Sequence, residues 1–252
     1  MKILEDLHLV GSGNFGISHP TDCNIYLIDA GGTFVLVDAG SGIEPNRIVE
    51  NIKRDGFPTN RIEYLILTHA HWDHAGGCRA LADRLNCKIC AHRLSAPTLS
   101  QGSWRTPSQY HVKKEGIRVD IELEDEETLT VGEKRLRFIS TPGHSPDGIS
   151  IACHLGDGLA LLSGDTVLAN GKLGVITKDT NLQEYAKAIR ALCDLKPESL
   201  FPGHGLFTLS NAHVHLRLAW EKIETNWYDV SAGPTPFNPS WWWNLLKEDR
   251  KG

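Results

Sequence analysis

The sequence lacks any long apolar run, and this absence limits where the protein is expected to work. No segment of the 252 residues approaches the roughly 18 consecutive apolar residues that a membrane-spanning helix needs. The first residues, Met1 to His8, include charged side chains where a secretory signal would need an apolar stretch. We therefore expect a cytoplasmic protein that has no membrane partner.

An excess of positive charge is also missing. The chain has 26 Lys and Arg residues against 31 Asp and Glu residues, which gives a formal net charge of -5. Proteins that bind a phosphate backbone do so mainly through clustered basic side chains. We therefore do not expect nucleic acid as a partner, and a small-molecule substrate is favoured.

The cysteines show no spacing typical of a disulfide framework. There are six of them: Cys23, Cys78, Cys87, Cys90, Cys153 and Cys193. In a chain without an export signal they should be reduced thiols. Cys87 and Cys90 form a CxxC pair, but no second pair completes a four-sulfur metal site. We interpret this pair as small apolar residues in or near the core.

Extended and helical patterns alternate along the chain, with no linker rich in Pro, Gly or Ser. Runs of β-branched and aromatic residues predict strands at 24–28, 33–37, 62–67, 128–131, 136–140, 149–153, 159–162 and 199–201. Apolar residues at helical spacing predict helices at 45–55, 77–86, 181–195 and 211–227. Thr180 is the predicted N-cap of the third helix. We expect one domain over residues 1–252, with helices outside packed sheets.

Two segments fit no regular element. Residues 94–116 are polar and too long for a plain connection, which indicates a functional loop. Residues 232–252 form a tail rich in Pro and Trp, and the adjacent residues Trp241–Trp243 cannot all face one core. We expect the tail to pack on its own domain or to join two chains in a homodimer, and contact with an apolar substrate is the alternative.

Residue types that bind metals are concentrated between Thr68 and Gly77. His69, His71 and Asp73 follow a predicted strand, and alternate residues of an extended chain face the same side. His74 breaks this alternation, so the chain should turn there, and the Gly-Gly pair that follows supplies the freedom to turn. Two sets of donors would then point to neighbouring positions, which suits two metal ions about 3.5–4 Å apart.

Further candidate ligands lie where other predicted strands end. Pro-Gly-His occurs twice, at His144 and at His204, and Asp165 ends an apolar strand. Each of these alone would more often be an ordinary turn. Together they supply the donors that two coordination shells need beyond the first cluster.

These residues resemble the five-motif signature of the metallo-β-lactamase superfamily. The pattern runs in order from Val37–Gly40 through residues 69–74 to His144, Asp165 and His204. The resemblance implies an α+β fold, an αββα sandwich in which two mixed β-sheets are flanked by helices.

The resemblance also implies a role for each residue. Three side chains correspond to the ligands of a first metal ion: His69, His71 and His144. Three others correspond to the ligands of a second ion: Asp73, His74 and His204. Asp165 corresponds to a carboxylate that bridges both ions, and Asp38 to an acid that orients a ligand imidazole. The implied cofactors are two divalent metal ions, with Zn²⁺ expected and iron or manganese as alternatives.

Such a centre is expected to act as a hydrolase that uses a metal-bridging hydroxide. Two divalent ions make this nucleophile available at neutral pH because they lower the pKa of bound water. Asp73 is the expected proton shuttle, so Asp73 and Asp165 are the expected catalytic residues. The expected substrate is an ester, thioester or lactone of a small molecule.

Several alternatives stay open within the same superfamily. The layout is nearest to the glyoxalase II-like branch, although the basic residues that grip glutathione there have no obvious counterpart. A lactonase of quorum signals is one alternative, and β-lactamase activity would be incidental. A mononuclear-iron persulfide dioxygenase is the redox alternative, which a single Fe(II) with oxygen uptake would identify. A binding module with a vestigial centre is disfavoured because no expected ligand is missing.

Overall fold

The computed structural model describes residues 1–103, 116–177 and 179–225. The predicted tail at 232–252, with Trp241–Trp243, lies outside these residues, and so does most of the predicted 94–116 loop. The described start of that loop is not irregular, because residues Ser95–Gln101 form the helix α4.

The first sheet is mixed and, among the described residues, contains seven strands that lie side by side in chain order. They are β1 (Lys2–Leu4), β2 (Leu7–Gly11), β3 (Ile25–Asp29), β4 (Phe34–Val37), β5 (Ile62–Ile66), β6 (Lys88–His92) and β7 (Ile121–Leu123). The strands from β1 to β4 pair antiparallel, and those from β4 to β7 pair parallel. The helical elements of this half are α1 (Pro45–Arg54), the 3-10 turn η1 (Thr59–Arg61), α2 (Trp72–Ala75), α3 (Cys78–Leu85) and α4.

The second sheet is also mixed and has five strands in the described part of the chain, in the order β12-β11-β10-β9-β8. They are β8 (Thr128–Val131), β9 (Lys134–Ser140), β10 (Ile149–Leu155), β11 (Gly158–Gly164) and β12 (Ser199–Pro202). Only the β11–β12 pair is parallel. The helical elements of this half are the 3-10 turn η2 (Ala169–Gly171), α5 (Leu182–Leu195) and α6 (Ala212–Glu224).

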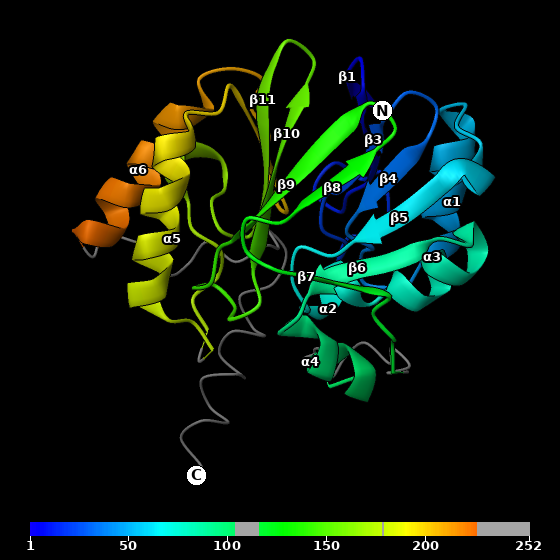
Figure 1. The fold of residues 1–252 in the computed structure, drawn as a ribbon, viewed down its shortest axis with the longest axis horizontal. Helices are drawn as coiled ribbons and strands as arrows, with labels where there is room; N and C mark the ends of the chain where they lie inside the picture. The colour runs from blue at the N-terminus through cyan, green and yellow to red at the C-terminus, as the bar shows by residue number, and fades with distance from the viewer. Residues whose placement is uncertain (104–115, 178, 226–252) are drawn as a thin grey trace.

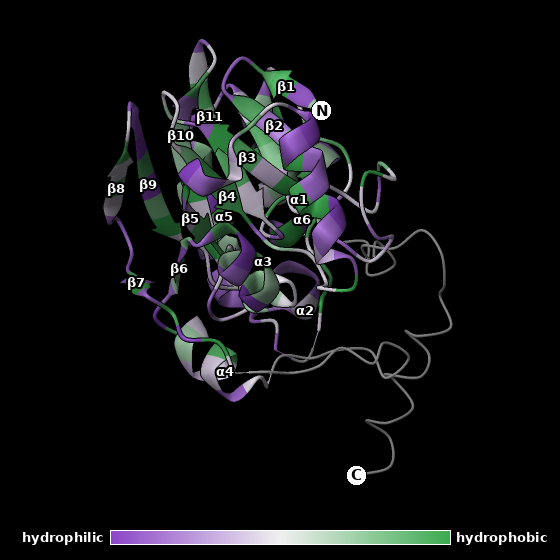
Figure 2. Cartoon of the chain, turned by 90° about the vertical axis from the view of Figure 1, so that its right-hand side faces the viewer, coloured by the Kyte–Doolittle hydropathy of each residue, from purple (hydrophilic) through white to green (hydrophobic). Residues whose placement is uncertain are grey.

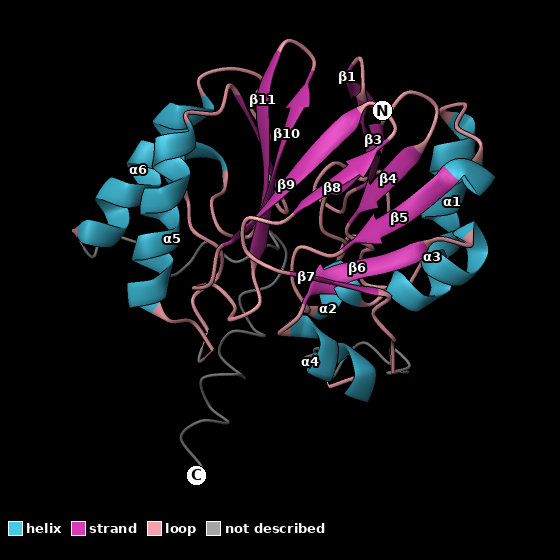
Figure 3. Ribbon diagram, in the orientation of Figure 1, coloured by secondary structure: helices cyan, strands magenta, loops and turns pink. Residues whose placement is uncertain are grey.

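Three apolar layers hold the two sheets and the outer helices together. In β3, Ile25 and Leu27 pack on the side of α1 and α3, whereas Tyr26 and Ile28 pack between the sheets. A third cluster joins the outer face of the second sheet to α5 and α6. Figures 1 and 3 show the resulting order of helices, sheet, sheet and helices. In Figure 2 the hydrophobic colour gathers on the central strands. The predicted αββα sandwich is confirmed.

Strand direction brings three loops of the second sheet to the same edge. Because β9 and β11 are each antiparallel to β10, they run in the same direction, and β12 runs parallel to β11. The carboxyl ends of β9, β11 and β12 therefore lie together. These are the strand ends that precede His144, Asp165 and His204.

The helix starts agree with the sequence prediction at α1 and differ at α5. Helix α1 begins at Pro45 and ends before Gly56, whose φ of +91° suits glycine. The N-cap of α5 is Asn181 rather than Thr180, because the Asn181 side chain accepts hydrogen bonds from two backbone N–H groups of the first turn. The Thr180 hydroxyl donates instead to the backbone oxygen of His144, at 3.3 Å.

No helix in the described ranges is both long and apolar enough to cross a membrane.

Candidate metal centre

The segment after β5 presents its side chains through a change from extended chain to helix. His71 is extended, with φ -70° and ψ 149°, and α2 begins at the next residue. The predicted alternation therefore holds for His69 and His71. It is wrong for Asp73, which, like His74, lies on the first turns of α2.

The Gly-Gly pair lies in the turn between α2 and α3, where glycine is required by close packing rather than by the backbone angles. Neither Gly76 nor Gly77 has a positive φ. A Cβ atom on Gly76 would lie 2.3 Å from the backbone oxygen of Ser41, and one on Gly77 would lie 2.1 Å from that of Ala39. The expected reason for these glycines is thus wrong, because what they allow is contact between α2 and the loop after β4.

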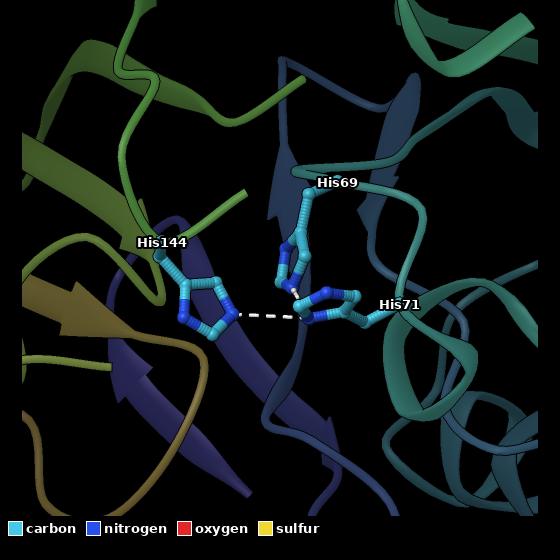
Figure 4. Close-up of side chains that lie close together, drawn as sticks. All are labelled: His69, His71 and His144. Carbon is cyan, nitrogen blue, oxygen red and sulfur yellow. Dashed lines mark hydrogen bonds between the residues drawn. The ribbon is translucent and has the colours of Figure 1, made fainter. Parts of the chain in front are cut away.

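Three imidazoles converge to form what we call the first group: His69, His71 and His144. The Nδ1 atom of His71 lies 3.0 Å from His69 Nε2 and 3.0 Å from His144 Nε2. Figure 4 shows the three rings pointing toward one another, with His144 approaching from a separate segment of the chain.

A second group lies beside the first and contains Asp73, His74 and His204. His74 Nε2 and His204 Nε2 are 3.1 Å apart, and Asp73 Oδ2 lies 3.2 Å from His204 Nε2. His74 and His204 are buried, whereas the side chain of Asp73 is 15% exposed. Asp73 is therefore the member of this group that solvent reaches most easily.

Asp165 lies within reach of both groups. Its Oδ2 atom is 3.6 Å from His144 Nε2 of the first group and 3.6 Å from His204 Nε2 of the second. Its Oδ1 atom is 3.5 Å from His74 Nε2. The structure thus brings all seven predicted donors together, with Asp165 between the two groups.

Asp38 hydrogen-bonds His74, the kind of contact that the family resemblance implied. Its Oδ2 atom lies 2.8 Å from His74 Nδ1, so Nδ1 carries the hydrogen and Nε2 faces the second group. Asp38 also accepts a hydrogen bond from the backbone N–H of Thr68 at 2.8 Å, and the Thr68 hydroxyl lies 3.1 Å from His69 Nδ1. Asp38 and Thr68 therefore link one imidazole of each group.

Other supporting residues were missed by the sequence patterns. The Tyr185 hydroxyl of α5 bonds the backbone oxygens of Asp165 and Thr166 at 2.9 and 2.8 Å. The Tyr26 hydroxyl of β3 donates to Pro202 O at 2.8 Å, close to His204. Asp147 accepts a hydrogen bond from Ala70 N at 2.9 Å. No spacing rule points to these residues, because each one acts on a backbone group that is distant in sequence.

A sequence profile described as "Metallo-beta-lactamase superfamily" matches residues 19–204, a span that includes Asp38 and all seven donors. The chain belongs to the metallo-β-lactamase superfamily.

Curated relatives of the chain carry names from this superfamily. The chain is 30% identical over 187 residues to "Beta-lactamase-like protein 2 homolog" of Caenorhabditis elegans, which covers 72% of the chain and 55% of that protein. It is 28% identical over 187 residues to "Hydroxyacylglutathione hydrolase" of Acidiphilium cryptum, covering 74% and 65% respectively. The chain thus spans less than two thirds of the length of either relative.

Solved structures share the fold. A subclass B3 metallo-β-lactamase of Bradyrhizobium japonicum superposes with a TM-score of 0.72 at 19% identity, covering 90% of this chain and 90% of that one. This superfamily fold generally serves metal-dependent hydrolysis, and the donors gathered here fit divalent metal ions.

The electrostatics of the first group favour uncharged imidazoles. Burial lowers the pKa of His69 well below its usual value, and the charges of His74 and His71 lower it further. Burial lowers the pKa of His144 to about 4, with His71 as the next cause. At neutral pH these two rings therefore carry no charge and can present a lone pair to a cation.

The carboxylates stay ionised although Asp165 is buried and Asp73 is largely shielded from solvent. Burial by itself would raise the pKa of Asp165, but the imidazoles of His204 and His74 outweigh it and hold this pKa well below the usual range. Burial is likewise outweighed at Asp73, whose pKa is lowered by the hydrogen bond from His204 and the charge of His74. The centre thus combines the uncharged nitrogen donors of His69 and His144 with the negative oxygen donors of Asp73 and Asp165.

The surroundings of His74 favour positive charge. Burial by itself would lower the pKa of His74, but the carboxylates of Asp38 and Asp165 outweigh it, and this pKa lies well above its usual value. A buried site with negative neighbours that stabilises an added proton also stabilises a bound cation.

The arrangement of the donors fits metal ions. A tetrahedral zinc site with bonds of about 2.0–2.1 Å places its donors about 3.3 Å apart. The donor pairs described above are separated by 3.0 to 3.6 Å. Asp165 Oδ1 is buried and accepts no hydrogen bond from the described residues. At Gly203 a Cβ would lie 2.5 Å from this same oxygen, so glycine leaves the space beside it free.

Proposed function

We propose that this chain is a hydrolase that holds two divalent metal ions, for which Zn²⁺ is the first candidate. We propose that it cleaves an ester, thioester or lactone of a small molecule. The observation that carries the proposal is the position of Asp165, which lies 3.6 Å from a nitrogen donor of each group. Two ions bound there would supply an activated water at neutral pH and a Lewis acid for the bond being cleaved.

Asp73 is the residue to which we assign proton transfer. Its Oδ2 atom is held 3.2 Å from His204 Nε2, and the side chain is 15% exposed, more than those of His74, His144, Asp165 or His204. An ionised carboxylate at the edge of the group can accept a proton from the attacking water and return it to the leaving group. Its lowered pKa keeps the carboxylate ionised at neutral pH.

The completeness of the second group supports two ions rather than one. The ligand atoms of Asp73, His74 and His204 lie within 4.8 Å of one another, as those of the first group do. A mononuclear-iron dioxygenase would need only one set of donors. Imidazole and carboxylate donors suit zinc, and they also suit manganese and iron.

The choice among ester, thioester and lactone substrates draws support from one relative. The Acidiphilium cryptum relative is named for hydrolysis of hydroxyacylglutathione. This likeness is the reason to place acylglutathione thioesters first among the substrates to be tested.

Metal analysis combined with a substrate panel tests the proposal. The full chain, loaded with Zn²⁺, Mn²⁺ or Fe²⁺ in turn, would be assayed on thioesters, lactones, aryl esters and β-lactams. We expect two ions per chain and turnover of a carbonyl substrate, and a loss of at least about 100-fold in kcat/KM for Asp165→Asn, since a direct ligand should matter more than a supporting residue. Asp157→Asn, in the exposed β10–β11 turn, is the matched control. One iron per chain with oxygen uptake, or turnover that survives Asp165→Asn, would overturn the proposal.

A further inference from the structure

Asp147 forms a bridge between the two loops that build the first group. It lies three residues after His144, and its Oδ2 atom accepts a hydrogen bond from the backbone N–H of Ala70 at 2.9 Å. Ala70 stands between His69 and His71 in the chain. One side chain thus connects the loop that carries the third imidazole to the peptide between the other two.

The bridge is buried and has a second anchor. Asp147 is 6% exposed, and Ser95, the first residue of α4, is fully buried. The Ser95 hydroxyl donates to the same Asp147 Oδ2 atom, at 2.6 Å. A buried carboxylate is stable only with such partners, so its orientation is set by these two donors.

The loop that carries Asp147 is itself closed by backbone hydrogen bonds. The Thr141 N–H donates to Gly148 O at 2.8 Å, and the Gly143 N–H donates to Ser145 O at 3.0 Å. Because the loop is closed, fixing the side chain of Asp147 also restricts the position of His144. The distance of 3.0 Å between His144 Nε2 and His71 Nδ1 therefore depends on a connection that this carboxylate helps to fix.

We propose that Asp147 is a positioning residue of the first group, which holds the His69–His71 loop and the His144 loop at the separation that a metal ion requires. This inference rests on the proposed metal centre. It adds a contact from the second sheet that acts on donors of the first sheet, and it includes Ser95 as the residue that orients the carboxylate.

The key variants separate the hydrogen-bond acceptor from the charge. Asp147→Ala removes the acceptor and leaves two buried donors, Ala70 N and Ser95 Oγ, without a partner. Asp147→Asn keeps a carbonyl oxygen in nearly the same place. Because both donors address one oxygen, the asparagine can satisfy both and should restore the function of the bridge.

The readout is binding of Co²⁺ to the metal-free full chain, followed by its visible absorption bands and by chelator competition. For Asp147→Ala we expect one of the two Co²⁺ ions to bind about 10–100-fold more weakly, the usual effect of losing a partner outside the coordination shell, with a changed spectrum. Asp147→Asn should stay within about 3-fold of the parent protein, in keeping with its retained acceptor. A parent chain that binds no Co²⁺ would contradict the metal centre itself, whereas a parent with two ions and an Asp147→Ala variant of equal affinity and spectrum would overturn this inference alone.

A matched carboxylate separates positioning from stability. Asp22 is buried and accepts hydrogen bonds from the N–H and the hydroxyl of Ser41 at 2.8 and 2.5 Å. Because Asp22 also accepts a hydrogen bond from His19 N at 3.1 Å, Asp22→Ala should lower the thermal stability at least as much as Asp147→Ala does, without changing the Co²⁺ spectrum. Equal spectral changes in both variants would show only a general structural role for Asp147.

Ser95 provides a milder test if Asp147→Ala does not fold. Ser95→Ala removes the donor that orients the carboxylate, and we expect Co²⁺ affinity to fall about 3–10-fold, below the effect of losing the bridge. Ser100→Ala on the same helix is the control, because its hydroxyl donates to Pro97 O and not to the bridge. If Ser95→Ala binds Co²⁺ as Ser100→Ala does, the assigned bridge is wrong.

Discussion

The first sheet supplies its donors to the candidate metal centre from one short segment, whereas the second sheet supplies them from three separate loops. His69, His71, Asp73 and His74 follow β5 within six positions. The donors of the second half follow β9, β11 and β12 and are up to 60 residues apart in sequence, from 144 to 204. Local chain geometry thus organises the first set, and strand direction organises the second.

The comparison teaches that neither half can build the centre alone. Each group contains donors from both sheets, since His144 completes the first group and His204 the second. The hydrogen bonds that support the donors also connect the two halves of the molecule. Tyr26 of the first sheet holds Pro202 O beside His204, while Asp147 of the second half holds Ala70 N beside His71. Metal binding should therefore report on the contact between the sheets.

The largest expected effect comes from removing one imidazole of the first group from either half. His69→Ala and His144→Ala should each lower the binding affinity for one of the two metal ions by at least about 100-fold. The reason is that a direct ligand matters more than its supporting partners. Elemental analysis after dialysis would measure the ions retained. The variants should match each other although the residues come from different sheets. Loss of both ions in one variant and of none in the other would break the equivalence.

A smaller effect on metal binding is expected from a supporting residue whose contact with a donor lies wholly within the first half. Asp38→Ala removes the acceptor 2.8 Å from His74 Nδ1 and should weaken metal binding about 10–100-fold, mainly at the second group. Chelator competition would measure it. Asp29→Ala, at the end of β3, is the control, since its carboxylate bonds only the backbone of Gly31 and Gly32 among its described hydrogen bonds. Equal affinity in both variants would contradict the role of Asp38.

Acid should destabilise the metal-free protein through the first group. The pKa of His144 is lowered from 6.5 to about 4, so the unfolded chain takes up a proton at a pH where the folded chain does not. This contribution to stability is present above about pH 6.5 and is lost as the pH falls toward 4. Between about pH 7 and pH 5 we expect the free energy of unfolding to fall by about 2 kcal/mol. Urea unfolding of the parent and of His144→Ala at both pH values would measure this change. If the free energy of unfolding falls equally in both proteins, His144 is not the cause.

The smallest effect concerns the start of α5 in the second half. Asn181→Ala should lower the free energy of unfolding by about 1 kcal/mol, because it removes the side chain that caps the helix. Thr180→Ala should leave the helix cap in place, since its hydroxyl accepts from Thr177 N at 2.8 Å and donates to His144 O at 3.3 Å, and neither group belongs to α5. Denaturant unfolding and the helical circular-dichroism signal compare the two variants. A loss of helix content in Thr180→Ala and none in Asn181→Ala would return the capping role to Thr180.

The parts of the fold that the sequence predicted are those with strong local patterns. Helix α1 was predicted because Ile48 and Ile52 recur at helical spacing between a proline and a glycine. Strand β2 was not predicted, because its alternation of apolar and polar side chains covers only Leu7 to Leu9 and is too short to indicate a strand. Strand β7 has three residues and depends on pairing with β6.

At the candidate centre, the sequence predicted the seven side chains that the structure brings together, but not all the residues that support them. The donors could be found because histidine and aspartate occur at strand ends in a recognisable order. Asp147 and Tyr185 could not be found, because each bonds a backbone group whose position depends on the packed sheets. The presentation of Asp73 was predicted wrongly, since the helix α2 begins one residue before it.

The sequence by itself determined the chemistry of the donors and the strand ends at which they stand, because side-chain identity and hydrophobic periodicity are local properties. Only the tertiary structure decided that Asp165 lies 3.6 Å from both His144 Nε2 and His204 Nε2 and that Asp147 joins two ligand loops. These distances follow from the direction of the strands and the packing of two sheets, which form only when residues far apart in the chain bury their apolar faces together.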